Sequence, residues 1–179
     1  MTAIATDFLV GFDLETTGLS IQHDRIFTAA LTDADERRYH LLLNPEKRIS
    51  AKVTEITGLT NDDAARGMDY REGVAHISDL LASAWDHGAV VVGHNILGFD
   101  LPMIRMQERY VFGQPRTNAI GPTLDTMKLY RKARLGTKYT LTLACETLGI
   151  DLSNAHDALA DAEASMALAR KLIDMGVSY

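Results

Sequence analysis

The chain has 179 residues, of which 46% are hydrophobic and 23% are charged. This length and composition exclude a disordered or fibrous protein and predict a single domain, residues 1–179, with one hydrophobic core. The 24 Asp and Glu residues outnumber the 18 Lys and Arg residues and give a net charge of −6, which argues against nucleic-acid binding by a broad basic surface. Any nucleic-acid contact is therefore expected to be local.

The sequence carries no signal for export or for a membrane. The amino terminus lacks a basic leader, and Asp7 interrupts its apolar run. No window approaches the roughly 20 apolar residues that a spanning helix needs. Cys145 is the only cysteine, so no intrachain disulfide can form. We therefore expect a cytoplasmic protein that does not contact a membrane.

The first half of the chain predicts three strands followed by helices. Apolar and polar residues alternate from Phe8 to Glu15, which indicates a strand that ends at Thr17-Gly18. Further along, Ser50 and either Thr60 or Asn61 are typical N-caps of short helices. The expected ranges are hairpin strands 25–31 and 39–43 around a turn at 33–36, short helices ending at Gly58 and Gly67, and an amphipathic helix over 72–85.

The second half alternates strands and helices. Residues 89–93 are continuously apolar and rich in valine, which is typical of a buried central strand. The expected ranges after it are a helix over 98–112, a loop over 113–122, a short strand over 123–125, and helices over 126–134, 140–149 and 157–175. This order predicts an α/β layered fold with a mixed sheet.

Asp13 and Glu15 lie two residues apart on the first predicted strand, so both carboxylates face the same side. Two close carboxylates repel each other unless a cation neutralises them, and oxygen-only ligands suit Mg²⁺ or Mn²⁺. An isolated pair at this spacing is more often a solvated strand surface. Here the pair ends a core strand, where ligands gather in α/β sheets, so it is a candidate metal site.

A third carboxylate follows the buried strand, in the segment GHNILGFD that ends at Asp100. The segment is a strand end, a glycine-containing turn and a helix start. By itself Asp100 is explained equally well as an acid in the first turn of a helix, where the dipole favours negative charge. His94 by itself is more often a structural hydrogen-bonding residue at a strand end than a ligand.

The segment HDALAD, residues 156–161, opens the last predicted helix. Asp157 has the character of an N-cap, which places His156 on the preceding loop and Asp161 one turn inside the helix. His156 and Asp161 can then face one cleft, as a base beside a metal ligand. Each of them considered alone is more often a surface or structural residue.

The ordered set of motifs closely resembles the DEDDh 3′→5′ exonuclease family, which is typified by the proofreading subunit of bacterial replicative polymerases. The motifs that carry the resemblance are DLETTG at 13–18, HNILGFD at 94–100 and HDALAD at 156–161. Segments at 57–60, 124–126 and 144–150 extend it over nearly the whole chain. One departure is Thr57, which stands where many members carry a histidine.

The resemblance implies a ribonuclease-H-like α/β fold, with a mixed five-stranded sheet flanked by helices, and two divalent cations, Mg²⁺ or Mn²⁺. Carried over by residue, Asp13 would bridge the two ions, Glu15 and Asp161 would complete one of them, and Asp100 would act directly or through water. His156 would be the general base for the attacking water. The product would be a nucleoside 5′-monophosphate.

The resemblance also implies how the substrate is held. Thr16, Gly18, Leu19, Asn95 and Phe99 border the motifs and would hold the last nucleotides, with Leu19 and Phe99 as apolar surfaces for the terminal bases. The expected partner is a nucleic-acid 3′ end, of DNA rather than RNA. The chain ends 18 residues after Asp161, without a long tail for docking a polymerase, which favours a free-standing enzyme and leaves a polymerase partner open.

The densest basic run in the sequence has two explanations, either a solvated helix face or a track for the nucleic-acid backbone. Its residues are Lys128, Arg131, Lys132, Arg134 and Lys138.

Three other functions compete with a DNA exonuclease. A family member that only binds nucleic acid would be expected to lack some catalytic residues, yet all five candidate positions carry the residue that catalysis needs. An all-helical metal phosphohydrolase could use His156 and Asp157 as a ligand pair, but it would leave Asp13 and Glu15 unexplained. An exoribonuclease of the same family stays open, because recognition of the 2′-hydroxyl depends on a few shape-setting contacts.

Overall fold

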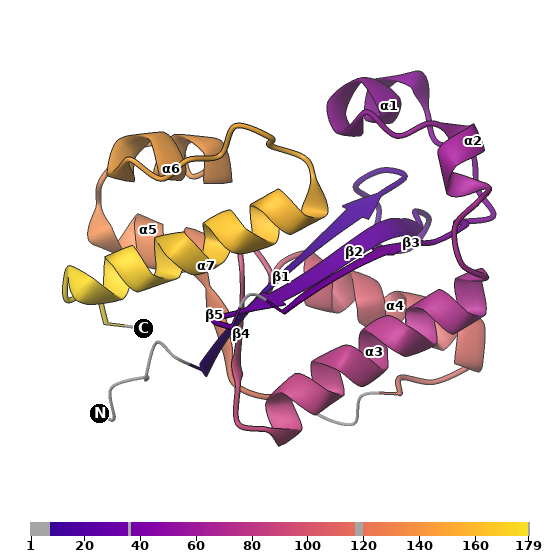
Figure 1. Cartoon of the computed structure of the whole chain (residues 1–179), viewed down its shortest axis with the longest axis horizontal. Coiled ribbons are helices and arrows are strands. Elements are labelled where there is room, and N and C mark those ends of the chain that lie inside the picture. Colours follow the sequence, from indigo (N-terminus) through magenta and orange to yellow (C-terminus); the bar gives the residue numbers. More distant parts are fainter. Residues whose placement is uncertain (1–7, 36, 117–119, 179) are drawn as a thin grey trace.

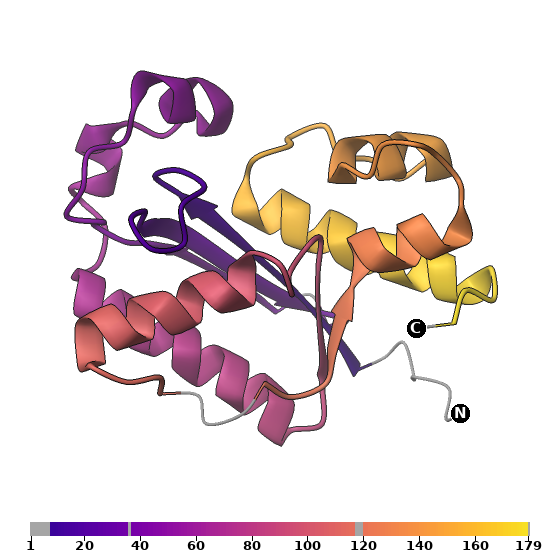
Figure 2. The ribbon, with the colours of Figure 1, turned by 180° about the vertical axis from the view of Figure 1, so that it is seen from behind.

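The computed structural model describes residues 8–35, 37–116 and 120–178. The predictions about the amino-terminal leader, the last residue of the 33–36 turn and part of the 113–122 loop lie outside these residues. Within them, the chain forms one mixed five-stranded sheet with helices on both faces (Figures 1 and 2). This is the α/β architecture that the sequence predicts, and it excludes the all-helical alternative.

The sheet is organised around β1, which lies at its centre in the order β3-β2-β1-β4-β5. Strands β2 and β3 continue from β1 as antiparallel neighbours, whereas β4 and β5 run parallel to β1. The strands are β1 (Leu9–Thr16), β2 (Ile26–Asp33), β3 (Arg38–Leu42), β4 (Val90–Gly93) and β5 (Thr123–Asp125). All five predicted strands are therefore confirmed.

The helices follow the predicted order, and local capping explains their ends. Ser50 and Thr60 each accept a hydrogen bond from the third residue of the following helix, and Thr60 forms a complete capping box with Asp63. The helices are α1 (Ala51–Thr57), α2 (Asn61–Ala64), α3 (Tyr70–Asp86), α4 (Asp100–Phe112), α5 (Thr126–Ala133), α6 (Leu141–Leu148) and α7 (Ala158–Asp174). None of them is long and apolar enough to cross a membrane in the part of the chain that is described.

Two helices begin at other residues than the sequence predicts. Helix α3 starts at Tyr70 because the Asp69 side chain accepts the Glu72 N–H as its N-cap. Helix α4 starts at Asp100 rather than at residue 98, because the Asn95 carbonyl accepts the N–H groups of both Gly98 and Phe99 in a separate turn. The second shift places Asp100 in the first turn of the helix.

The two faces of the sheet bury different helices, as Figures 1 and 2 show from opposite sides. Phe12 and Leu14 of β1 lie in one core cluster with residues of α3 and α4, such as Ile77 and Leu101. Leu9 lies in a second cluster with residues of α5, α6 and α7. Since side chains alternate along a strand, Gly11, Asp13 and Glu15 share the α7 face with Leu9. The alternation of β1 therefore directs the candidate carboxylates toward α7.

Gly11 allows α7 to lie unusually close to β1. A Cβ atom at this position would lie 2.4 Å from the backbone carbonyl oxygen of Ala162. Small residues line the same contact, because Ala30 of β2 is buried with Ala158 and Ala162 of α7. The close packing holds the first turns of α7, which carry Asp161, directly over the strand that carries Asp13 and Glu15.

We expect Gly11→Ala to destabilise the protein by about 1–3 kcal/mol, the usual cost of overpacking a core, because backbone cannot move aside as a side chain can. Thermal unfolding would show a lower Tm. Gly136→Ala is the matched control, since its Cβ would meet first the terminal hydroxyl of Tyr130, at 3.0 Å. A Gly11→Ala protein with the Tm of the unmodified chain would contradict the role given to this contact.

Candidate active site

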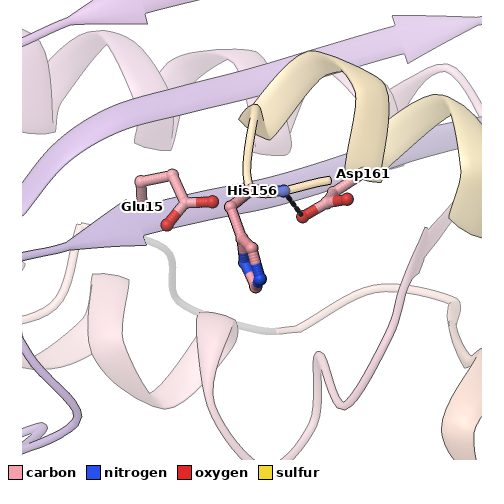
Figure 3. Close-up of side chains that lie close together, drawn as sticks. All are labelled: Glu15, His156 and Asp161. Atoms are coloured by element: carbon pink, nitrogen blue, oxygen red, sulfur yellow. Dashed lines mark hydrogen bonds between the residues drawn. The ribbon is translucent and has the colours of Figure 1, made fainter. Parts of the chain in front are cut away.

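The residues of the first and last motifs meet at the carboxyl end of β1. Glu15, His156 and Asp161 each offer one ligand atom, and these atoms lie within 4.8 Å of one another. Figure 3 shows the His156 side chain between the two carboxylates, with Glu15 on β1 and Asp161 on α7. The fold thus joins a strand near the start of the chain to a helix near its end.

The start of α7 is shaped by its two aspartates. Asp157 is the N-cap, as predicted, and its Oδ1 accepts the N–H groups of Leu159 and Ala160. Asp161 Oδ2 accepts the backbone N–H of His156 at 3.1 Å (Figure 3). His156 adopts a positive φ of 67°, which is uncommon for a residue other than glycine, and its side chain is exposed. The turn therefore presents the imidazole to solvent beside the Asp161 carboxylate.

Asp13 and Asp100 complete a cluster of four carboxyl groups. Burial, reinforced by Asp100, Asp161 and Glu15, raises the pKa of Asp13 well above its ordinary value. Burial likewise raises the pKa of Asp100 to about 7, with Asp125 and Asp161 contributing. The charges of the three motifs are thus coupled in one site, although Asp13 and Asp100 lie outside the compact group formed by Glu15, His156 and Asp161.

The pKa values of Glu15 and Asp161 are raised in the same way. Burial, followed by the charge of Asp161, raises the pKa of Glu15 to about 8. Burial also raises the pKa of Asp161, against the lowering effect of the hydrogen bond from the His156 backbone. None of the ion pairs among the described residues involves these carboxylates. The cluster therefore lacks a cationic side chain that would neutralise it.

The donor set fits divalent cations. Asp161 Oδ1 is buried and has no hydrogen-bond partner among the described residues, and a buried polar atom is seldom left so. Carboxylate oxygens are the ligands that Mg²⁺ and Mn²⁺ prefer, and a cation would relieve both the orphaned oxygen and the mutual repulsion. Asp13, Glu15, Asp100 and Asp161 are the residues that could hold such ions.

Asp125 holds the turn between β4 and α4 through hydrogen bonds, a role that was not predicted from the sequence. Its carboxylate caps α5 and also accepts the backbone N–H groups of Asn95 and Leu97. Asn95 has a positive φ of 64°, and Gly98 leaves room for its side chain, since a Cβ there would lie 2.5 Å from Asn95 Oδ1. Asp125 directly before a predicted helix was the available signal.

His94 is structural in this fold. Its Nδ1 lies 3.0 Å from Thr126 Oγ1, and its Nε2 lies 2.7 Å from the Tyr139 carbonyl oxygen. Both ring nitrogens are therefore engaged away from the carboxylates. Thr57, the departure from the family pattern, also satisfies its hydroxyl locally, because Oγ1 donates to the Val53 carbonyl within α1.

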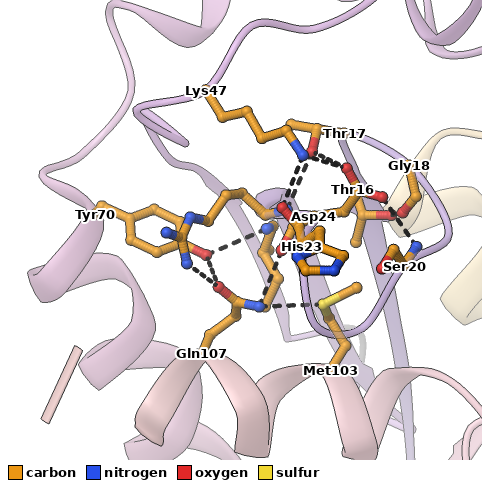
Figure 4. Close-up of polar contacts among 12 residues, drawn as sticks. Thr16, Thr17, Gly18, Ser20, His23, Asp24, Lys47, Tyr70, Met103 and Gln107 are labelled. Atoms are coloured by element: carbon orange, nitrogen blue, oxygen red, sulfur yellow. Dashed lines mark hydrogen bonds and ion pairs between the residues drawn. The ribbon is translucent and has the colours of Figure 1, made fainter. Parts of the chain in front are cut away.

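Asp24 organises the loop between β1 and β2, which carries two of the candidate substrate-binding residues, Gly18 and Leu19, and directly follows a third, Thr16. Its carboxylate accepts Thr17 Oγ1–H at 3.0 Å, the Ser20 N–H at 2.9 Å and the Lys47 ammonium at 2.6 Å (Figure 4). The Lys47 interaction helps to lower the pKa of Asp24 despite its partial burial. Gly18 is needed here because a Cβ would lie 2.5 Å from Asp24 Oδ2.

The far end of this loop is attached to α4 through Gln107. Gln107 Nε2 donates to the Asp24 carbonyl, and its Oε1 accepts Arg25 Nη1–H and the Tyr70 hydroxyl (Figure 4). Neither Asp24 nor Gln107 was predicted to matter, because a sequence gives no sign of which distant residues a loop contacts. The network fixes the loop to the same helix that begins with Asp100.

The candidate substrate-binding residues surround the carboxylates in different states of exposure. Leu19 projects from the loop with 86% of its surface exposed, whereas Phe99 is half-buried against the core. Thr16 is buried and donates its hydroxyl hydrogen to the Gly18 carbonyl. Gly18 and Asn95 are half-buried beside them.

Comparison with known proteins finds one family and one fold. The model of the exonuclease family of RNase T type matches residues 10–169. The DNA polymerase III PolC-type of Mycoplasma pneumoniae is 33% identical over 149 residues, which are 80% of this chain and 10% of the polymerase. The chain therefore spans about a tenth of this curated relative.

Among solved structures, E. coli exonuclease I in complex with a dT13 oligonucleotide has a TM-score of 0.78 and 23% identity, covering 93% of this chain and 40% of the other. The zinc-bound form of the E. coli exonuclease I complex with single-stranded DNA has a TM-score of 0.76 at 23% identity, covering 94% and 40%. At this identity the likeness shows the fold, which is the predicted ribonuclease-H-like fold with a mixed five-stranded sheet.

The raised acid pKa values predict a pH-dependent stability for the metal-free protein. Folding raises the pKa of Glu15 to about 8 and that of Asp100 to about 7, so the folded state binds protons that the unfolded chain releases near ~4. This stabilisation is complete below the unfolded pKa and is lost as pH rises through the folded pKa.

Thermal unfolding in the presence of a chelator should therefore show Tm falling from about pH 5 to about pH 8. Glu15→Gln should flatten the slope, and Mg²⁺ should restore the Tm lost at the alkaline end. Asp174→Asn, an exposed acid at the end of α7, is the control. A metal-free Tm that is constant over this range would contradict the coupling of these carboxyl groups.

Proposed function

Because the chain belongs to the exonuclease family, as a DEDDh-like 3′→5′ exonuclease, we propose that it removes nucleotides one at a time from the 3′ ends of DNA. Single-stranded or frayed ends are the proposed substrate, and nucleoside 5′-monophosphates the product. The observation that carries the proposal is the buried carboxylate cluster at the end of β1, with its unpartnered Asp161 Oδ1 and its adjacent exposed imidazole.

The proposed cofactors are two divalent cations, Mg²⁺ or Mn²⁺, held by Asp13, Glu15, Asp100 and Asp161. When bound, such ions supply activation of the attacking water and stabilisation of the leaving 3′ oxygen. The carboxylates contribute the negative charge that draws the ions in. Asp100 and Asp161 are buried, whereas Asp13 and Glu15 are half-buried, so the proposed site stays open to the attacking water. The acidic net charge of the chain is then consistent with a phosphate-binding protein, because the ligand carboxylates are neutralised locally.

His156 is proposed as the general base. One of its ring nitrogens lies within 4.8 Å of a carboxylate oxygen of Glu15 and of Asp161. This position is close to where the proposed attacking water would lie. The hydrogen bond from its own N–H to Asp161 Oδ2 fixes the backbone that carries the ring. A ring nitrogen would accept the proton of the water, and the exposure of the side chain lets that proton pass on to solvent.

The terminal nucleotides are proposed to lie between the β1–β2 loop and the turn before α4. Leu19 offers an exposed apolar surface on one side, and Phe99 offers another from the turn that carries Asn95. Thr16 and Gly18 shape the backbone that holds Leu19 in place. The complexes of E. coli exonuclease I with oligonucleotides support a single strand of DNA at this fold, and the PolC-type polymerase supports DNA over RNA.

A degradation ladder on end-labelled DNA tests this function directly. We expect products that shorten from the 3′ end, complete inhibition by EDTA, and no reaction at a 3′-phosphorylated end. Single strands should be degraded faster than blunt duplex, because fraying an end costs about 1–2 kcal/mol per base-pair step. Asp161→Ala should remove nearly all hydrolysis while the protein stays folded, and Asp174→Ala on the same helix should keep it.

A folded Asp161→Ala protein with near-normal turnover would contradict the site. Cleavage of a circular single strand would contradict the requirement for a free 3′ end, and a ladder that shortens from the 5′ end would contradict the direction. Ribooligonucleotides in the same assay test the DNA preference, and faster hydrolysis of RNA would replace DNA by RNA as the substrate.

The role of His156 has its own test. We expect His156→Ala to lower the single-turnover rate by roughly 10²–10⁴-fold, the usual contribution of a positioned base, while cation affinity changes less than in Asp13→Ala. The rate of the unmodified enzyme should rise with pH through the range in which histidine side chains lose a proton, and the variant should lose that rise. If instead cation affinity drops as far as in Asp13→Ala, His156 is a ligand rather than the base.

A further inference from the structure

A groove along the outer face of α4 opens beside the candidate active site. It has a volume of about 440 Å³. Its wall residues include Ile21, Leu97, Pro102, Arg105, Met106 and Arg109. The wall is therefore a mixture of apolar side chains and two guanidinium groups, which is the chemistry that single-stranded nucleic acid binds through its bases and its phosphates.

The groove residues of α4 form one continuous stripe. Pro102, Arg105, Met106 and Arg109 are spaced three and four residues apart, so they share a face of the helix. Arg105 and Arg109 are one turn apart, with Cβ atoms about 6 Å from each other, which suits two consecutive phosphates of an extended strand. The stripe leads from the first turn, where Asp100 lies, toward the other end of the helix over about 13 Å.

The two arginines are the free cations of this region. Arg37, Arg38, Lys47, Arg66 and Arg116 are each paired with a carboxylate. Among the described residues, no carboxylate forms an ion pair with Arg105 or Arg109, and neither guanidinium stacks on an aromatic ring. Arg105 and Arg109 both line the groove and lie one turn apart, so two guanidinium groups are available there to an anionic occupant.

The groove also shares two chain segments with the proposed nucleotide site. Leu97 belongs to the turn that carries Asn95 and Phe99, and Ile21 belongs to the same loop as Leu19. The hydrogen bonds of Gln107 with Asp24 and Arg25 hold that loop against α4, so both walls of the groove are fixed to one helix (Figure 4). A strand whose end lies between Leu19 and Phe99 would therefore have the groove as its neighbouring surface.

We propose that this α4 groove binds the part of a single-stranded DNA substrate immediately 5′ to the nucleotide that is removed, with Arg105 and Arg109 contacting its phosphates. The proposal rests on the proposed function and adds a second part to the substrate site. It also assigns the strand to α4 rather than to the basic run on α5. The two helices cover opposite faces of the sheet, so the two tracks are distinct (Figure 2).

The test compares two substrates in the double variant Arg105→Ala/Arg109→Ala. With an oligothymidylate of about 12 residues, we expect KM to rise roughly tenfold at low salt, with kcat within about twofold of the unmodified enzyme. With the p-nitrophenyl ester of thymidine 5′-monophosphate, which has no upstream nucleotides, kcat/KM should stay unchanged. The log–log dependence of oligonucleotide binding on salt should become shallower by about 1.4, because each single-strand phosphate contact contributes about 0.7.

Two further variants make the outcome specific. Arg105→Lys/Arg109→Lys keeps the charge and should restore the salt dependence. Arg131→Ala/Lys132→Ala removes the same charge from α5 and should leave KM and the salt dependence unchanged. An equal loss on both substrates in the α4 variant, or a larger loss in the α5 variant, would overturn the groove.

Binding without turnover separates this proposal from the proposed function. Fluorescence anisotropy of a labelled oligothymidylate with the Glu15→Gln protein measures binding of the strand without its hydrolysis, and the further change on adding Arg105→Ala/Arg109→Ala isolates the part due to the groove. A loss of affinity on adding Arg105→Ala/Arg109→Ala supports the groove even if no substrate is hydrolysed, which would count against the proposed function only. Unchanged affinity and salt dependence in this background would overturn the groove while leaving hydrolysis of DNA ends intact.

Discussion

The mutual repulsion of Asp13, Glu15, Asp100 and Asp161 is the constraint on which the rest of the molecule depends. Two unit charges about 4 Å apart repel by about 4 kcal/mol at an effective dielectric constant of 20, so the fold must hold the group together against its own electrostatics. Burial, followed by the charges of neighbouring acids, raises the pKa of each of these carboxyl groups. The proposed divalent cations would relieve this cost, because they would neutralise the carboxylates that repel each other.

Rigid secondary structure holds the carboxylates in place. Asp13 and Glu15 lie on the central strand of the sheet, where neighbours on both sides fix the backbone. Asp161 lies in the first turns of a helix that presses on Gly11 through the Ala162 carbonyl. Asp100 begins α4 just after a turn whose N–H groups are held by Asp125. The backbone that carries each carboxylate is therefore fixed by secondary structure and by packing or hydrogen bonds.

Loops surround this frame, and hydrogen bonds from polar side chains hold them in place. Asp24 ties the loop that carries Leu19, and Gln107 joins the end of that loop to α4. Asn95 and His156 have positive φ values, a strain of order 1–3 kcal/mol each that is often found at functional sites. The resulting surface combines an exposed leucine, an exposed imidazole and the α4 groove around the carboxylates, which suits a substrate whose end must be seated while the rest of the strand extends away.

The sequence by itself determined the elements and the chemistry. Alternation in β1, the valine run of β4 and the caps at Ser50, Thr60 and Asp157 are local signals, because hydrogen bonding and side-chain direction within a few residues decide them. The ordered motifs around Asp13, Asp100 and Asp161 carried the resemblance that predicted an exonuclease, and the family match over residues 10–169 confirms that family. The starts of α3 and α4 each shifted by two residues. For α4 the reason is the competing turn at Asn95, whose carbonyl accepts hydrogen bonds that no local propensity reveals.

The tertiary structure alone decided which residues meet. It placed His156 between Glu15 and Asp161 and engaged both ring nitrogens of His94 elsewhere. It also gave Asp24, Gln107 and Asp125 their roles. Within the described part of the chain, it left one oxygen of Asp161 without a hydrogen-bond partner and Arg105 and Arg109 without ion pairs. These outcomes depend on contacts between segments far apart in the chain, and such contacts follow from packing in three dimensions rather than from any spacing along the sequence.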